Sequence, residues 1–380
     1  MNIGLLGCGV VGGGVLALTQ DRSDIRVTRV LVRRPKEGLP EGAATRDVQD
    51  ILNDAAIDTV VEVMGGLHPA YEYVTAAMER GKHVVTANKA LIAAYYRELT
   101  ALAREKGVAL RYTAAVGGGI PWLVNLARCK RLDTVCAVGG IMNGTTNFIM
   151  DAMHKSPVDF PLILKEAQEL GYAEADPSAD IDGDDIRRKL CISANIAFDT
   201  VLDEETIPTF GIRTVTAADI AAFQAHGFVC KLLAAAERTD RGVCAYVEPT
   251  LVDCGEPEAA VPANYNLIGY VGEQVGRQSF FGQGAGRFPT ASNVVQDCLT
   301  ILAGDRAAYT DRVAPVALDL TAEAHPYYVR TGRPDAFLRS VAADTWGAGV
   351  VTGAVNTGEM LAWAKRQLSA DPACFIAGIR

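Results

Sequence analysis

The first 130 residues alternate short runs of β-branched residues with amphipathic stretches of helical length. This alternation predicts a parallel sheet covered by helices, because each parallel strand needs a crossover segment before the next one begins. The expected strands are residues 3–6, 27–32, 59–63, 83–86 and 109–112. Helices are expected over 70–80 and 97–106, each followed by a glycine that ends it, Gly81 and Gly107. The sequence therefore predicts an α/β domain with a doubly wound sheet.

A glycine motif follows the first expected strand, where residues 7–12, GCGVVG, fit the pattern G-x-G-x-x-G. The first glycine permits a tight turn, the second lets the backbone approach a pyrophosphate, and the third lets helix and strand pack closely. The helix N-terminus then offers amides and a positive dipole end to the phosphate. An ordinary glycine turn is the alternative, but the surrounding pattern favours a Rossmann-type cofactor site. Its candidate residues are Gly7, Gly9, Val10, Val11 and Gly12.

The end of the second expected strand bears on which cofactor binds. A carboxylate there would accept a hydrogen bond from the ribose 2′-hydroxyl of NAD and would repel the 2′-phosphate of NADP. This chain has Arg33 and Arg34 at that place, with Lys36 as a further candidate. Two cations and no acid predict NADP as the preferred cofactor and NAD as the alternative. Each arginine could instead be a solvated turn residue.

Composition narrows the possible partners and the compartment. The 380 residues carry a net charge of -9, so the surface would repel nucleic acids and anionic lipids. The N-terminus lacks the features of a signal peptide, and no apolar run is long enough to span a bilayer. Nine cysteines without a C-x-x-C pair are typical of reduced thiols. We therefore expect a cytoplasmic protein with neither nucleic-acid nor membrane partners.

The length predicts more than one domain, and the rhythm of the sequence changes near residue 132. The first domain is expected over 1–131, with a returning segment at about 284–319 that includes a helix over 290–302. A second, α+β domain is expected over 132–283. Residues 320–380 would form a C-terminal extension that ends in a helix and a strand.

Residues 171–189 contain six carboxylates followed by three cations. A calcium loop of the EF-hand type is one interpretation, but its twelfth position, which should be a bidentate glutamate, is Lys189. We expect structural roles, such as helix capping and turn stabilisation, for four of the acids. These four are Asp176, Asp180, Asp182 and Asp184.

Two lysines are candidates for chemistry. If a helix starts near residue 184, Asp185 and Lys189 are spaced i, i+4 and project from one face, where both could act on one ligand. An exposed ion pair of little consequence is the alternative for these two. Lys89 follows the expected strand 83–86 at the carboxyl edge of the sheet, which is the edge where such sheets bind ligands.

Several longer motifs, in this order, resemble the homoserine dehydrogenase family over roughly residues 1–320. Besides the glycine motif they are TANKA at 86–90, VGGGIP at 116–121, GIMNGTTNF at 140–148, GYAEADP at 171–177, the segment 182–189 and GAG at 284–286. The asparagine-threonine block and the acidic block are far more specific than the glycine motif.

The resemblance implies a reversible hydride transfer between NAD(P)H and L-aspartate 4-semialdehyde, which yields L-homoserine on the route to threonine and methionine. Lys189 matches the family's proton-donor and acceptor lysine. Lys89 matches its other active-site lysine, whose charge would act on Lys189 and which would contact cofactor or substrate. Glu174 and Asp185 match acids that bind the substrate ammonium. Positions that approach the cofactor are matched by Gly171, Gly284 and Gly286.

The resemblance also implies a monovalent cation, usually sodium, held by a glutamate side chain and by backbone carbonyls. Val116, Gly118 and Ile120 match the carbonyl ligands, but Thr113 stands at the position of the glutamate. A neutral hydroxyl cannot supply the negative charge. Weaker binding of sodium or potassium and an empty site therefore both remain open.

The resemblance further implies a homodimer, or a higher homo-oligomer, formed through the second domain. Many members add a ligand-sensing module of the ACT type; here residues 320–380 could be a shortened ACT-like element, a dimer element or a lid. Two other functions remain: an oxidoreductase acting on another semialdehyde or keto acid, and a non-catalytic NADP-binding protein. Retention of Lys89 and Lys189 beside Glu174 and Asp185 speaks against the second.

Overall fold

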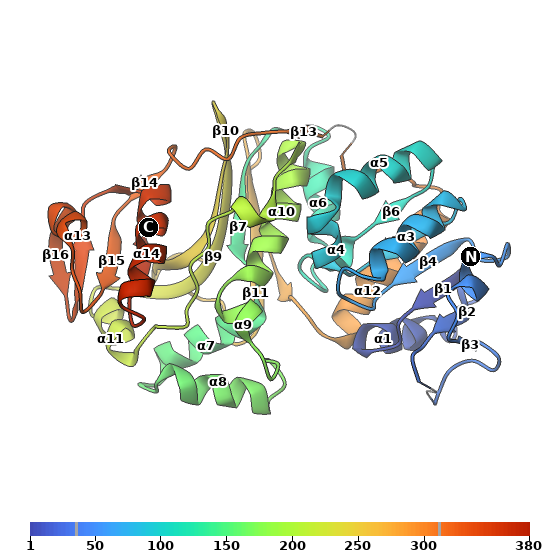
Figure 1. Cartoon of the computed structure of the whole chain (residues 1–380), viewed down its shortest axis with the longest axis horizontal. Coiled ribbons are helices and arrows are strands. Elements are labelled where there is room, and N and C mark those ends of the chain that lie inside the picture. Colours follow the sequence, from blue (N-terminus) through green and yellow to red (C-terminus); the bar gives the residue numbers. More distant parts are fainter. Residues whose placement is uncertain (35–36, 311–312) are drawn as a thin grey trace. The chain divides into compact units, whose positions relative to one another are not determined.

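The computed structural model describes residues 1–34, 37–310 and 313–380, so the candidate cation Lys36 lies outside the described residues. The chain divides into two compact units, labelled by their elements in Figure 1. The first unit consists of Met1–Leu132, Asp199–Val201 and Gly282–Ala314. The second consists of Asp133–Phe198, Leu202–Phe281 and Pro315–Arg380. Within the described ranges, no helix is both long and apolar enough to cross a membrane.

The first unit contains a six-stranded parallel sheet in the order β3-β2-β1-β4-β5-β6. Its strands are β1 (Asn2–Leu6), β2 (Arg26–Leu31), β3 (Ala44–Thr45), β4 (Thr59–Glu62), β5 (His83–Thr86) and β6 (Leu110–Arg111). The strand order reverses between β1 and β4, and doubly wound sheets bind dinucleotides at that point. The predicted α/β class is confirmed. The two-residue strand β3 was not predicted, since so short a segment has no recognisable period.

The helices of the first unit come from two distant parts of the chain. They are α1 (Val10–Thr19), α2 (Gln49–Leu52), α3 (Ala70–Glu79), α4 (Lys89–Ala94), α5 (Tyr96–Lys106), α6 (Trp122–Cys129) and α12 (Arg287–Leu302), with a 3-10 turn η1 at Thr113–Ala115. Helix α12 packs directly on α1. The two helices lie so close that a Cβ at Gly14 would be 2.6 Å from the Arg287 carbonyl oxygen. Ala291, Val294 and Cys298 of α12 are fully buried in the core of this unit.

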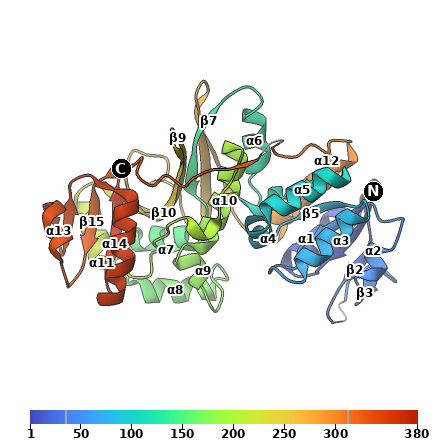
Figure 2. The ribbon, with the colours of Figure 1, turned by 45° about the horizontal axis from the view of Figure 1, so that its top comes forward.

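The second unit contains a nine-stranded sheet in the order β12-β11-β7-β9-β10-β19-β15-β17-β16. Its strands are β7 (Val135–Ile141), β9 (Phe228–Thr239), β10 (Gly242–Asp253), β11 (Tyr265–Gly272), β12 (Gly276–Gln283), β15 (Tyr327–Arg330), β16 (Ala342–Trp346), β17 (Gly349–Thr352) and β19 (Phe375–Ile379). Its helices are α7 (Gly144–Lys155), α8 (Phe160–Glu169), α9 (Ser178–Ile181), α10 (Asp184–Phe198), α11 (Ala217–Ala225), α13 (Ala336–Val341) and α14 (Thr357–Ala370). Short pieces of the second unit are β14 (Ala324–His325), β18 (Val355–Asn356) and the 3-10 turn η2 (Glu204–Thr206). Strand β8 (Thr200–Val201) belongs to the first unit and pairs with β13 (Ala314–Pro315). Figure 2 shows α14 beside β15.

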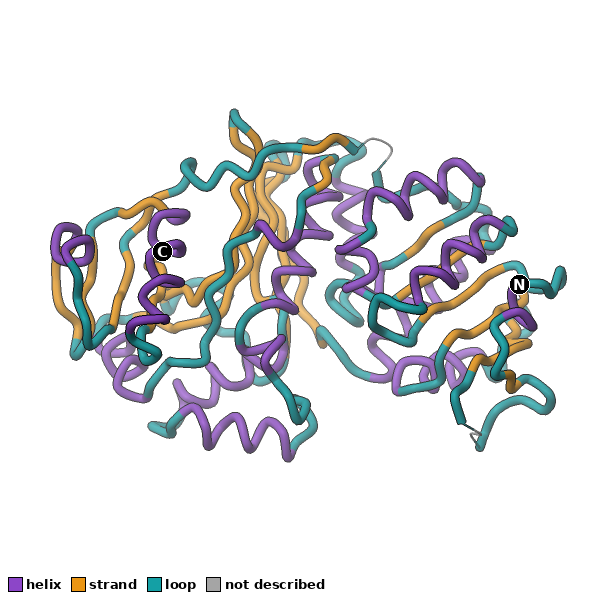
Figure 3. Tube along the Cα trace, viewed as in Figure 1, coloured by secondary structure: helices purple, strands orange, loops and turns teal. Residues whose placement is uncertain are grey.

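The C-terminal segment forms a β-α-β-β-α-β pattern, from β15 through α13, β16, β17 and α14 to β19. Its strands lie in the order fourth, first, third, second, which is the arrangement of a split β-α-β motif. Strand β19 continues the sheet by pairing parallel with β10, where Thr250 lies opposite Gly378. Figure 3 shows these strands in orange. The sequence predicted only the closing helix and strand of this pattern.

A buried carboxylate ties the C-terminal pattern to α11. Asp219, which is fully buried, accepts hydrogen bonds from Tyr328 Oη at 2.7 Å and from Arg330 Nε at 2.7 and 3.0 Å. It also closes a capping box with Thr216 at the start of α11. One carboxylate therefore pairs with a partly buried guanidinium and holds two segments together.

Candidate active site

The glycine motif adopts the turn that the sequence predicted. Gly7 has φ +96°, a conformation that favours glycine. A Cβ at Gly12 would lie 2.4 Å from the Gly7 carbonyl oxygen, so the helix packs tightly against the turn. A Cβ at Gly9 would meet nothing within 4 Å, which leaves the space beside this residue open. Val10 and Val11 begin α1 and direct their amides toward the turn region, as an N-terminal phosphate site requires.

A cavity of about 790 Å³ adjoins this turn. Gly7 and Gly9 line it together with Arg33 and Arg34, so the predicted cofactor residues of both motifs share one space. Arg46 lines it as well, because β3 pairs with β2 and brings the residue after it to the same edge. The sequence analysis missed Arg46, since it did not predict β3. Three guanidinium groups therefore belong to one cavity.

A buried acid organises the carboxyl edge of the sheet. Glu62, at the end of β4, accepts hydrogen bonds from Met64 N at 2.7 Å and from Thr86 Oγ1 at 2.6 Å. Its side chain is fully buried, and burial raises the pKa of this carboxyl against the opposing effect of its hydrogen bonds. Glu62 was not predicted as a site residue, because the Thr86 hydroxyl that it binds lies on a neighbouring strand. It fixes the turns after β4 and β5, next to the cavity.

Lys89 is the first residue of α4, directly after this edge, and is half-buried. Asn88 caps the helix by accepting from Leu91 N at 3.1 Å, and its Nδ2 donates to the Gly66 carbonyl at 2.6 Å. The TANKA motif therefore holds Lys89 in a fixed place at the carboxyl edge of the first unit.

Lys189 lies in the second unit, on α10, with only 7% of its surface exposed. Its Nζ lies 2.7 Å from Asp185 Oδ2 and donates to the Met142 carbonyl at 2.6 Å. Asn143 Nδ2 donates to Asp185 at 2.8 Å and to Asp180 at 2.7 Å. Asp185 is 6% exposed, so the interpretation of an exposed ion pair is wrong. The structure shows a buried lysine oriented by a carboxylate and a carbonyl.

Asn143 connects the two most specific motifs of the sequence. Its Oδ1 caps α7 by accepting from Thr146 N at 2.9 Å, while its Nδ2 holds two acids of the acidic block. Burial raises the pKa of the Asp180 carboxyl, and the nearby Asp185 raises it further. The sequence analysis used the asparagine block only as a resemblance, because nothing local predicts a partner some forty residues away.

The remaining acids and glycines of the acidic segment lie closer to solvent. Glu174 and Gly171 are exposed, in the loop that follows α8. Asp182 pairs with Arg213 at 2.6 Å, and Asp176 accepts from Ser178 N at 3.1 Å, so both have structural contacts. The structure therefore brings Asp185 and Lys189 together and leaves Glu174 accessible to a ligand.

Gly284 and Gly286 lie in the first unit, before α12. A Cβ at Gly118 would lie 2.5 Å from the Gly284 carbonyl oxygen, and Gly119 N donates to the Gln283 carbonyl at 3.1 Å. Gly286 is exposed and has φ +127°. The GAG turn and the VGGGIP turn thus support each other.

The VGGGIP turn does not present a set of ligands that fits a cation. The carbonyl oxygens of Gly118 and Ile120 both accept hydrogen bonds from Asn293 Nδ2, at 2.6 and 3.1 Å. Thr113 donates to Asp297 through its amide, at 2.9 Å, and through its hydroxyl, at 2.6 Å. Two of the three predicted carbonyl ligands therefore face a hydrogen-bond donor.

The whole of this organisation matches known proteins. One family model, described as the NAD-binding domain of homoserine dehydrogenase, matches residues 7–113, and another, described as homoserine dehydrogenase, matches residues 121–299. The homoserine dehydrogenase of Bacillus subtilis is 38% identical over 323 residues, which cover 82% of this chain and 75% of that protein. The chain belongs to the homoserine dehydrogenase family. It is therefore an oxidoreductase, and the resemblance seen in its sequence is confirmed.

Other members of the family support this assignment over the full length. The homoserine dehydrogenase of Synechocystis is 42% identical over 317 residues, covering 80% of this chain and 73% of that protein. The crystal structure of a homoserine dehydrogenase from Thiobacillus denitrificans has a TM-score of 0.89 and 33% identity, and the match covers 100% of this chain and 98% of that one. The C-terminal β-α-β-β-α-β pattern is thus included in the similarity.

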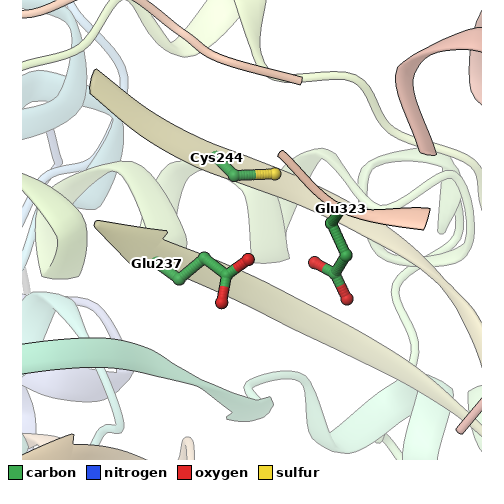
Figure 4. A group of neighbouring side chains, drawn as sticks. All are labelled: Glu237, Cys244 and Glu323. Carbon is green, nitrogen blue, oxygen red and sulfur yellow. The ribbon is translucent and has the colours of Figure 1, made fainter. Parts of the chain in front are cut away.

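A second group of possible metal ligands lies in the second unit, apart from the predicted site residues. Ligand atoms of Glu237, Cys244 and Glu323 lie within 4.8 Å of one another (Figure 4). Arg380 Nη2 already pairs with Glu323 at 2.5 Å and supplies a positive charge. Burial, and then the nearby carboxylates, raise the pKa of the Cys244 thiol to about 12, so it stays protonated at neutral pH. Arg380 therefore offsets the charge of one of the two carboxylates.

The buried contacts between Asp297 and Thr113 can be tested by measuring how the unfolding free energy depends on pH. Burial raises the pKa of its carboxyl from 3.8 to about 6, against hydrogen bonds from Thr113 that lower it. Between these values the native state binds more protons than the unfolded state, so its stability falls as pH rises. We expect Asp297→Asn, which keeps an acceptor for the Thr113 amide, to gain up to about 3 kcal/mol in unfolding free energy relative to the parent between pH 4 and pH 6. Urea titrations at several pH values measure this.

The exposed Asp21 serves as the control for that experiment. Asp21→Asn makes the same chemical change at an exposed surface position, and its effect on stability is measured at the same pH values as a baseline. A stability difference for Asp297→Asn that does not vary with pH would contradict the raised pKa of the Asp297 carboxyl.

Proposed function

We propose that this chain reduces L-aspartate 4-semialdehyde to L-homoserine with NADPH, and catalyses the reverse reaction, in the cytoplasm on the route to threonine and methionine. The observation that carries the proposal is Lys189 Nζ, buried and held by Asp185 and by the Met142 carbonyl. A homodimer formed through the second unit, as the family resemblance implies, belongs to the same proposal.

Reduction of an aldehyde needs a hydride at carbon and a proton at oxygen. The nicotinamide, when bound, supplies the hydride. The ammonium of Lys189 carries three N–H donors, and Asp185 and Met142 engage two of them. We assign the third to the carbonyl oxygen of the substrate, where Lys189 gives up its proton during reduction and takes it back in the reverse reaction.

The other predicted residues bind and orient. We assign the carboxylates of Asp185, which lies beside Lys189 Nζ, and of the exposed Glu174 to the ammonium of an amino-acid substrate. We assign Lys89 to contact with cofactor or substrate from the carboxyl edge of the first unit. Gly171 and the Gly284–Gly286 turn are assigned to close approach of the cofactor.

The reaction is tested by following the loss of NADPH absorbance with aspartate semialdehyde, and its gain with homoserine and NADP. We expect turnover in both directions and a lower KM for NADPH than for NADH. A folded protein that binds NADPH but turns over neither substrate would contradict the proposed reaction. It would then favour another semialdehyde or a binding protein without chemistry.

Cofactor preference has its own test. Arg33 and Arg34 are exposed residues of the cofactor cavity, where they can form charge-assisted hydrogen bonds with a 2′-phosphate. We expect the Arg33→Ala, Arg34→Ala double variant to raise the Kd of NADPH at least about tenfold, and that of NADH little, since such bonds contribute about 1.5–3 kcal/mol. Fluorescence titration measures both constants.

Arg80→Ala, at an exposed arginine outside the cavity, is the matched control and should leave both constants unchanged. An equal loss for the two cofactors in the double variant would show that the phosphate is bound elsewhere, and Arg46→Ala would then be measured.

A further inference from the structure

Helix α12 holds both ends of the segment that runs from η1 through the VGGGIP turn. Asn293, which is 5% exposed, donates through Nδ2 to the carbonyl oxygens of Gly118 and Ile120. Asp297, one helical turn later, receives the amide and the hydroxyl of Thr113. All five residues lie in the first unit and are buried. The two side chains therefore form a clamp on this segment, which we call the α12 clamp.

The clamp and a cation would compete for the same carbonyl oxygens. Asn293 Nδ2 lies 2.6 Å from one oxygen and 3.1 Å from the other, so an ion bound to both would overlap the amide nitrogen. The Ile120 carbonyl also accepts from Trp122 N at 2.7 Å, which engages both of its lone pairs. The amide must present its nitrogen here, because an oxygen so close to an acceptor would be repelled. Rotating Asn293 away would leave a buried amide to be satisfied elsewhere.

The residue at the position of the family's glutamate brings no charge of its own for an ion to neutralise. Thr113 is neutral where the family resemblance implies a glutamate, and its hydroxyl contacts both Asp297 and Tyr309 Oη, each at 2.6 Å. The Asp297 carboxylate accepts hydrogen bonds from Thr113 and, at 3.5 Å, from Tyr309 Oη. A glutamate with a monovalent cation sums to zero charge, as do a threonine and an asparagine. The two neutral residues are thus a consistent pair.

We infer that the Asn293 amide occupies the place of the monovalent cation, so that this chain holds its VGGGIP turn by hydrogen bonds and needs no sodium or potassium. Asn293 is then a positioning residue for the turn that supports Gly284 and the cofactor side of the first unit. The inference goes beyond the proposed reaction and can be tested without turnover.

The test compares melting temperatures of the unliganded protein in sodium, potassium and choline chloride at equal ionic strength. We expect curves that coincide within about 1 °C for the parent protein, together with no sodium-specific broadening of the 23Na resonance, because nothing bound only by the native state is added. Asn293→Asp replaces the donor by an anionic acceptor of nearly the same shape. We expect its melting temperature to rise with sodium or potassium concentration and not with choline.

The control makes the same change at an exposed position of the first unit, Asn53→Asp, which should gain no ion-specific dependence. A second variant, Thr113→Glu with Asn293→Ala, restores the acid and removes the donor, and it should also become cation-dependent. The inference is overturned if the parent protein melts higher in sodium than in choline and broadens the 23Na signal in a way that potassium reverses. That readout on the parent is decisive even where a variant does not fold.

Discussion

Lys189→Ala is expected to lower turnover of aspartate semialdehyde by at least about a hundredfold, the usual scale for losing a general acid, while NADPH still binds. The lysine is buried between Asp185 and the Met142 carbonyl in the second unit, whereas the glycine motif and its cavity lie in the first. Removing the ammonium therefore removes the proton donor without touching the phosphate site. Steady-state rates and a fluorescence titration with NADPH measure the two effects separately.

Two comparisons distinguish a loss of catalysis in Lys189→Ala from a loss of folding. Asp185 keeps Asn143 as a donor in the variant, so its carboxylate is not stranded, and the melting temperature checks this. Lys165→Ala changes a lysine that is mostly exposed on α8 and should leave turnover unchanged. Near-normal turnover in folded Lys189→Ala would exclude Lys189 as the proton donor.

Asp219→Ala is expected to cost about 3–5 kcal/mol of unfolding free energy, the range observed when one partner of a buried ion pair is removed. The variant leaves the Arg330 guanidinium without its carboxylate and the Tyr328 hydroxyl without its acceptor, and it breaks the capping box of α11. Denaturant unfolding followed by circular dichroism measures the loss.

Asp240→Ala, at an exposed turn position, is the comparison and should change stability by less than about 0.5 kcal/mol. Asp219→Asn keeps the shape and some hydrogen bonds but not the charge, so an intermediate loss is expected. Equal stability of Asp219→Ala and the parent would mean that the C-terminal pattern does not depend on this contact.

Local patterns were sufficient for the longer strands of the first unit and insufficient for much of the second unit. The strands β1, β2, β4 and β5 are short β-branched runs, and such runs carry their own signal. Strand β9 has no such signal, because Ala234–Ala236 favour a helix by propensity. These alanines form a strand because the neighbouring β7 approaches closely: a Cβ at Gly139 would lie 2.3 Å from the Ala234 carbonyl oxygen. Tertiary packing overrode propensity there.

Some residues of the candidate site could be predicted from local sequence patterns, and others could not. The spacing of Asp185 and Lys189 on one helix was readable, since it depends only on helical geometry. Asn143, Glu62, Arg46 and Asn293 were not readable, because each acts on partners from another element. Asn293 lies more than 170 positions along the chain from the carbonyls that it contacts. Sequence reasoning therefore proposed the candidate reacting groups and missed the residues that hold them.

The segments that form the first unit are synthesised far apart in time, because they come from distant parts of the chain. Val15 of α1 is buried against a core that includes Ala291 and Val294 of α12, which emerge only after most of the second unit has been made. At about 5–20 residues per second, the interval is on the order of ten seconds. During that interval the nascent cofactor domain exposes an apolar face on α1. A chain that stops before residue 287 lacks α12, so its Rossmann domain cannot complete the core that Val15 shares with Ala291 and Val294.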